Sequence, residues 1–133
     1  MLRVYGIGHL KPMALSAQPP RSAELTLVGI GDPQIQDGRN AVSTVGARIR
    51  GAESGGVALE PAPPSGFSGA AVVDAQGQFV GLAGIRATPS QASLVSAAAI
   101  RKFLEDAKVA PVSGGTSIDA AKASVTRIIC VRK

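Results

Sequence analysis

The sequence has few aromatic residues and almost none of the side chains that hold disulfides or zinc. Aromatics make up 3% of the 133 residues, and tryptophan is absent. A single cysteine, Cys130, excludes an internal disulfide, and one histidine, His9, leaves no spacing typical of a zinc site. The interior must therefore be built from valine, isoleucine, leucine and alanine.

Long apolar runs and clustered charge are also missing. No apolar stretch approaches the length of about 20 residues that a membrane-spanning helix needs. The net charge is +5, which raises the question of an anionic partner, but the basic residues are scattered along the chain. They are not interleaved with the stacking aromatics typical of single-strand binders. We therefore expect neither a membrane span nor a nucleic-acid partner.

What the sequence does contain is the pattern of a small all-β domain. Sixteen glycines and nine prolines supply many turns, while 45% of the residues are apolar. Short apolar runs separated by turn signals predict six strands, a spacing typical of a small antiparallel barrel. These strands are expected at 24–31, 40–49 (with a bend or bulge at Gly46), 55–60, 70–74, 79–85 and 92–95.

A helix is expected after the sixth strand. Ser96 is a suitable N-cap, and the helix at 97–108 has one apolar face. Residues 109–115 form a linker rich in proline, glycine and serine, and Ser117–Lys122 is too short to predict a helix. Ser124–Val131 is rich in β-branched residues and predicts a terminal strand. The apolar face of the first helix comprises Ala97, Ile100, Phe103, Leu104 and Ala107.

The most informative stretch runs from Pro64 to Leu82. Ser68 stands between glycines at a turn, and the apolar run after it is joined by Gln76-Gly77 to a second apolar run, which predicts a β-hairpin. Glycines beside a nucleophile let a substrate approach the backbone closely. The alternative interpretation is a Gly/Ser turn that only connects two strands.

This stretch resembles the nucleophile loop and following hairpin of trypsin-like serine proteases, above all the bacterial HtrA/Deg branch. The resemblance covers about residues 22–108 and implies the second of that family's two barrels, a six-stranded antiparallel Greek-key barrel. The segments that carry it match the family's patterns in the same order, namely Glu24–Pro33, Val42–Gly51, Gly66–Gly69, Gly77–Gly81 and Ser93–Leu104.

The resemblance also implies roles for individual residues. Ser68 would be the nucleophile, and the backbone N–H groups of Gly66 and Ser68 would form the oxyanion hole. The strand around Gly84, Ile85 and Arg86 would pair with the substrate backbone. Neither a cofactor nor a metal is implied. Two residues depart from the family pattern, because Phe67 replaces a polar residue and Ala70 replaces a second glycine.

The family's catalytic histidine and aspartate belong to its first barrel. Met1–Val4 resembles the tail of the segment that carries the aspartate, so both residues would lie upstream of this sequence. Residues 1–21 would then be a strand remnant, Leu2–Tyr5, and a connector from the missing barrel. His9 lies in that connector with no carboxylate next to it, which favours a solvated residue over a base for Ser68.

These observations predict a functional class with one alternative. The resemblance implies that the chain is the C-terminal domain of a bacterial serine endopeptidase, periplasmic or extracytoplasmic, which acts on peptides or unfolded proteins and is inactive without its first barrel. The alternative is a degenerate, non-catalytic module that binds peptides or scaffolds an assembly. Residues 109–133 lie outside the resemblance. The apolar ends Leu2–Tyr5 and Ser124–Val131 are expected to pair with each other or with a second copy.

Overall fold

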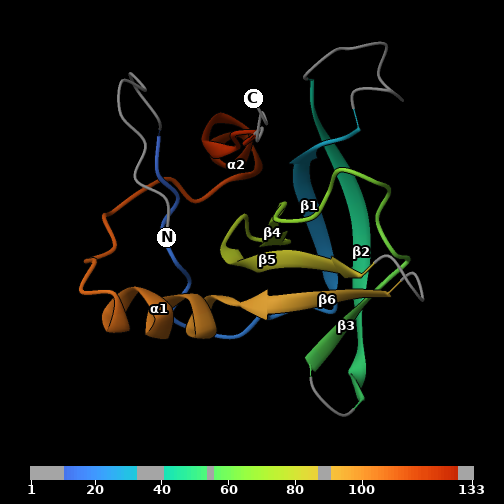
Figure 1. The fold of residues 1–133 in the computed structure, drawn as a ribbon, viewed down its shortest axis with the longest axis horizontal. Helices are drawn as coiled ribbons and strands as arrows, with labels where there is room; N and C mark the ends of the chain where they lie inside the picture. The colour runs from blue at the N-terminus through green and yellow to red at the C-terminus, as the bar shows by residue number, and fades with distance from the viewer. Residues whose placement is uncertain (1–10, 33–40, 54–55, 87–90, 129–133) are drawn as a thin grey trace, which may run out of the picture.

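Each of the six apolar runs forms a strand, and together the strands close into an antiparallel barrel (Figure 1). The computed structural model describes residues 11–32, 41–53, 56–86 and 91–128. The predicted six-stranded antiparallel barrel is therefore confirmed. Its strands are β1 (Glu24–Ile30), β2 (Val42–Glu53), β3 (Gly56–Glu60), β4 (Ala71–Asp74), β5 (Phe79–Arg86) and β6 (Gln91–Ser96).

The strand order around the barrel is β1-β2-β3-β6-β5-β4, with β4 closing back onto β1. The neighbours β4-β1-β2-β3 have the arrangement of a Greek key. Register between β1 and β2 is regular from Glu24↔Arg48 to Ile30↔Val42. Of the bend or bulge expected at Gly46, the bulge is wrong, because Gly46 pairs regularly with Thr26 and the irregularity in β2 falls between Arg50 and Glu53.

Alternation along the strands produces two separate apolar clusters, one on each side of the sheet. The inner cluster fills the barrel. The outer cluster, around Val28, Val73 and Phe79, lies on the outside of β1, β4 and β5 and is covered by segments from both ends of the chain. The buried members of the inner cluster are Leu25, Leu27, Ala47, Leu59, Phe67, Ala70, Val72, Val80, Ala83, Ala92 and Leu94.

Helix α1 (Ala97–Asp106) follows β6 directly and packs beside β5 and β6 (Figure 1). Its start is fixed as predicted, because the Ser96 hydroxyl accepts a hydrogen bond from the Ala99 N–H at 3.2 Å. The predicted apolar face is wrong at Phe103, whose side chain is 54% exposed, whereas Ile100 packs against the outer cluster.

The terminal strand predicted at Ser124–Val131 is wrong over residues 124–128. Ser124 ends a second helix, α2 (Ile118–Ser124), and residues 125–128 have no regular structure. The Ser117 hydroxyl caps this helix by accepting from the Ala120 N–H, and Ala121 is fully buried against the outer cluster. Burial of this small apolar face outweighs the β-propensity of the following residues.

The remaining terminal residues lie outside the described part of the chain. These include the predicted strand at Leu2–Tyr5, His9, and residues 129–131 of the predicted terminal strand. Neither α1 nor α2 is long and apolar enough to cross a membrane as a helix.

Candidate functional site

The loop that carries Ser68 consists of two consecutive tight turns. In the first, the Phe67 N–H donates to the Pro64 carbonyl at 3.3 Å, and in the second the Ala70 N–H donates to the Phe67 carbonyl at 3.0 Å. The third residue of each turn is a glycine with positive φ, 93° at Gly66 and 81° at Gly69. This is the arrangement of type II turns, which require glycine at that place. The predicted exposed turn is confirmed, with Ser68 at its surface.

Phe67 anchors this loop by closing one end of the barrel. Its side chain is only 1% exposed and belongs to the inner cluster. Gly29 of β1 makes room for it, because a Cβ there would lie 3.1 Å from the Phe67 ring and 2.9 Å from the Ala70 methyl. Ala70 is buried as well. Lys108 is the one non-glycine residue with positive φ in the described ranges, so the methyl of Ala70 causes no backbone strain. The two departures from the family pattern are thus core residues.

The Ser68 hydroxyl is exposed and unpaired with any residue that the structure describes. The N–H groups of Gly66 and Ser68 likewise have no acceptor among these residues. A hydroxyl becomes a strong nucleophile when a base takes its proton. The described ranges contain no histidine, since His9 falls outside them. Among the described residues, the loop therefore presents two backbone N–H donors without an acceptor and one exposed hydroxyl.

The Ser68 turn lies directly beside β5. The Gly69 N–H donates to the Ala83 carbonyl at 2.7 Å, and the Ala83 N–H donates to the Ala70 carbonyl at 2.9 Å. In a strand, the N–H and C=O of residues two apart point to the same side. The backbone N–H and C=O groups of Ile85 therefore point to the same side of β5 as those of Ala83, which is the side where Ser68 lies. The structure thus brings the predicted nucleophile and the predicted substrate strand together.

The rest of β5 is already paired. On one side β6 pairs with Gly81 to Arg86, and on the other β4 pairs with Phe79 to Leu82. No described strand pairs with residues 84–86 on the Ser68 side. Gly84 has no side chain, and Ile85 directs its side chain into the inner cluster. Residues 84–86, here called the free edge of β5, are therefore a short stretch next to the Ser68 turn without a described partner strand on that side.

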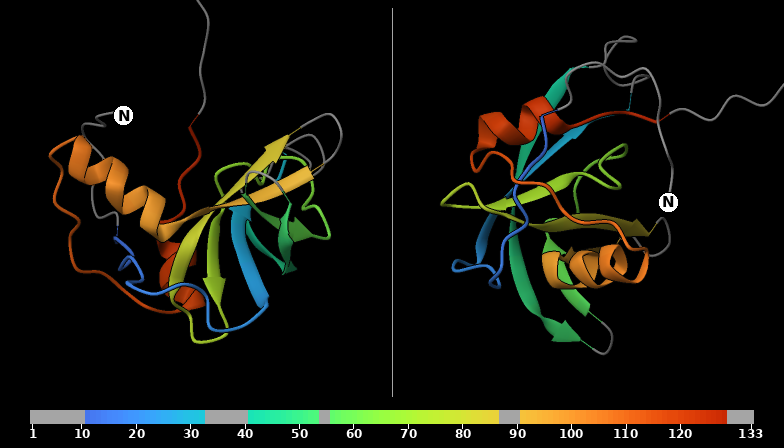
Figure 2. Two further views of the ribbon diagram at one scale, coloured as in Figure 1. Left: turned by 90° about the horizontal axis from the view of Figure 1, so that it is seen from below. Right: turned by 90° about the vertical axis from the view of Figure 1, so that its left-hand side faces the viewer.

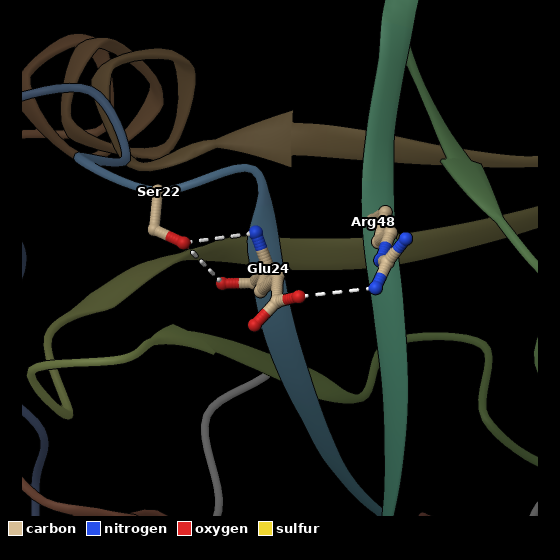
Figure 3. A network of polar contacts seen from close by, with 3 residues as sticks. All are labelled: Ser22, Glu24 and Arg48. Atoms are coloured by element: carbon tan, nitrogen blue, oxygen red, sulfur yellow. Dashed lines mark hydrogen bonds and ion pairs between the residues drawn. The ribbon is translucent and has the colours of Figure 1, made fainter.

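A concave feature lies at the opposite end of β1, and the sequence pattern did not predict it. It is a groove of about 800 Å³ lined by both charged and apolar residues. Arg48 bonds to Glu24 at 3.1 Å, and the Ser22 hydroxyl accepts from the Glu24 N–H at 2.9 Å (Figure 3). Arg50 binds Glu60 at 3.0 Å. The alternation of Arg48 and Arg50 along β2 was the signal for an exposed charged face.

The groove and the Ser68 loop are separate sites. The groove borders residues Glu24 to Thr26 at the start of β1, whereas Gly66 lies against Ile30 to Asp32 beyond its end. Its ion pairs are more than half exposed, and exposed pairs contribute about 0–1 kcal/mol each. The residues that the structure describes include no group of three or more histidine, cysteine, aspartate or glutamate side chains able to hold a metal.

Comparison with known proteins identifies no relative. No family model, no curated protein and no solved structure matches the chain significantly.

Proposed function

We propose that this chain binds an extended peptide along the free edge of β5, and that it is the substrate-binding half of a trypsin-like serine endopeptidase. The observation that carries the proposal is the position of the Ser68 turn. Its Gly69 N–H bonds to the Ala83 carbonyl, two residues before Ile85, which pairs with β6 but with no described strand on the Ser68 side. A peptide added to this edge would pair with the backbone of Ile85 as a further strand. Its next carbonyl would then approach Ser68.

The proposed chemistry follows from the groups at the turn. In the complete protease the Ser68 oxygen would attack the peptide carbonyl while a histidine base takes the hydroxyl proton. The N–H groups of Gly66 and Ser68, which have no acceptor in the described ranges, would stabilise the oxyanion. The base would return the proton to the departing amine, and water would then release the acyl group. The base and its aspartate would come from an upstream barrel, so this chain alone would bind peptide without cleaving it.

The second candidate is a non-catalytic peptide-binding module. It is favoured by the exposed Ser68 hydroxyl, which contacts no base among the described residues. Both candidates use the same edge of β5, and they differ in whether Ser68 ever reacts. For either candidate the proposed partner is an unfolded or extended polypeptide, and the resemblance would imply a periplasmic or extracytoplasmic location for a bacterial parent protein.

Binding is tested with a library of acetylated, amidated hexapeptides, followed by N-methyl scanning of the best binder. Ile85 presents one carbonyl on the Ser68 side, so methylation should abolish binding at the one peptide N–H that pairs with it and be tolerated at the two neighbouring positions, whose N–H groups point away from β5. A binder that tolerates methylation at every position, or a library without any binder, would overturn the edge-binding proposal.

Reactivity is tested separately with a fluorophosphonate probe on the chain and on Ser68→Ala. We expect no labelling of either protein, because the described part of the chain contains no histidine that could act as a base for Ser68. Labelling that depends on Ser68 would show that this chain activates its own serine and would eliminate the non-catalytic candidate. Joining a first barrel upstream should produce Ser68-dependent labelling in the protease, and its failure would favour the binding module.

A further inference from the structure

Residues 11–16, here called the docked segment, lie on the outside of the barrel and bond to parts of the chain far away in sequence. The Ser16 N–H donates to the Phe79 carbonyl of β5 at 3.0 Å. The Ala14 N–H donates to the Gly115 carbonyl at 3.2 Å, and the Gly115 N–H donates to the Pro12 carbonyl at 3.0 Å. The segment is therefore a short extended strand between β5 and the chain that leads into α2. In Figure 2 it is the blue stretch running along the orange linker.

The side chains of the docked segment behave like those of a bound strand. Met13 and Leu15 stand two residues apart, so both point to one side. Both pack against the outer cluster, together with Phe79 and the fully buried Ala121. Without the docked segment, this part of the outer cluster would face solvent.

Two side chains from other elements hold the backbone of this segment. The Nη2 atom of Arg101 in α1 donates to the Leu15 carbonyl at 3.3 Å and to the Ser16 carbonyl at 3.1 Å. The Ser124 hydroxyl of α2 donates to the Lys11 carbonyl. These contacts recognise main-chain oxygen atoms, as peptide-binding sites do. Recognition thus depends on an extended backbone and on two apolar side chains.

The docked segment is joined to β1 by an exposed connection. Residues 17–19 are exposed, and the bonds formed by Gln18 are local ones to Ser16 and Arg21. A segment that docks through its own contacts and hangs from an exposed connection can exchange between identical chains. Within one chain the segment is held by the high effective concentration of a tethered ligand, on the order of millimolar.

We propose that the surface beneath residues 11–16 is a second peptide-binding site, and that its partner in trans is the same segment of a second copy of this chain. The surface is formed by the start of β5, Arg101 of α1, Gly115, and Ala121 and Ser124 of α2. It does not include Ser68 or the free edge of β5, so it is independent of the function proposed above.

The test starts from the full chain with Met13→Ser and Leu15→Ser, which weakens the internal segment and leaves its site open. A fluorescent peptide of residues 11–18 should bind this variant saturably, at least about tenfold more tightly than a peptide with the same two serines. Adding Arg101→Gln should weaken binding by about tenfold, because two hydrogen bonds to a charged donor are lost. Lys102→Gln is the matched control and should leave binding unchanged, since Lys102 lies on the exposed face of α1 and its ion pair in the described ranges is with Asp106.

The wild-type chain gives a second measurement that does not depend on the variant folding. Light scattering at rising concentration should show a dimer that excess peptide of residues 11–18 converts to monomer. Equal binding of the two peptides, or a dimer that the peptide leaves intact, would overturn the proposal. The proposal would also be overturned if the wild-type chain stayed monomeric at every concentration and the variant bound neither peptide.

Discussion

At the residue scale, the Ser68 loop is shaped by what lies under it more than by the serine itself. Phe67 points into the barrel, Gly29 makes room for its ring, and the two flanking glycines bend the chain on either side. Gly66 and Gly69 share a positive φ but differ in their surroundings. An added Cβ at Gly66 would lie 2.5 Å from the Asp32 nitrogen, whereas at Gly69 it would meet nothing within 4 Å.

This contrast predicts different costs for the same substitution. Gly69→Ala should lower the free energy of unfolding by about 1–2 kcal/mol, the cost of a left-handed conformation for an L-residue. Gly66→Ala should cost more, because the methyl also collides with the backbone of residues 30–32. Urea denaturation followed by circular dichroism measures both variants. Equal losses would show that the loop moves away from β1 without penalty.

At the scale of elements, α2 shows how the end of the chain is fastened to the barrel. Ala121 faces the sheet and is fully buried, while Ala123 is exposed. The cap at Ser117 fixes where the helix begins. The helix is only seven residues long, so its stability comes from docking.

Substituting aspartate at these two alanines separates docking from helix propensity. Ala121→Asp should cost about 2 kcal/mol or more, because it places an unpaired carboxylate against the outer cluster. Ala123→Asp carries the same change in propensity on the exposed side and should cost only a few tenths of a kcal/mol. Amide exchange at Val125, whose N–H bonds to the Ala121 carbonyl, should accelerate in the first variant alone. Similar exchange in both would mean that α2 does not depend on this contact.

The comparison between sequence and structure is clearest among these elements. The barrel strands could be predicted because Pro, Gly and Asp punctuate short apolar runs, and Ser96 marked the start of α1 correctly. The absence of a strand over residues 124–128 could not be predicted, since a run rich in β-branched residues forms a strand only where a neighbouring strand is free to pair. The barrel is closed without it. The exposure of the Phe103 side chain could not be predicted either. The periodicity defines a broad apolar stripe on α1, and only part of that stripe packs against the barrel.

The candidate site divides in the same way. The exposed Ser68 turn and its neighbour β5 followed from local patterns of glycine and apolar residues. The docked segment did not, because its partners Phe79, Arg101 and Gly115 lie far away in sequence and carry no shared pattern.

At the scale of the whole molecule, the two apolar clusters share strands and are therefore expected to melt together. Leu27 belongs to the inner cluster and its neighbour Val28 to the outer one, and both are fully buried. Loss of the segments that cover the outer cluster, residues 11–16 and α2, would loosen β1 and β4, which also line the barrel.

Cooperativity can be measured with one substitution on each side of β1. Leu27→Ala should cost about 2–5 kcal/mol and Val28→Ala about 2 kcal/mol, and both should shift a single unfolding transition. Calorimetry with equal calorimetric and van't Hoff enthalpies would support one unit. A separate unfolding transition below the main one, seen in Val28→Ala alone, would show that the segments covering the outer cluster unfold independently of the barrel.

The Greek-key closure also determines how the chain can reach this structure. β1 must find β4, and β3 must find β6, across long intervening stretches. Folding dominated by such non-local pairs is slow, since the chain loses the entropy of loop closure before the stabilising contacts form. During synthesis from the N-terminus, β1, β2 and β3 emerge before β6 exists, with the free edges of β1 and β3 available to other nascent chains. The last strand of the barrel thus ends the period in which this protein is most prone to aggregate.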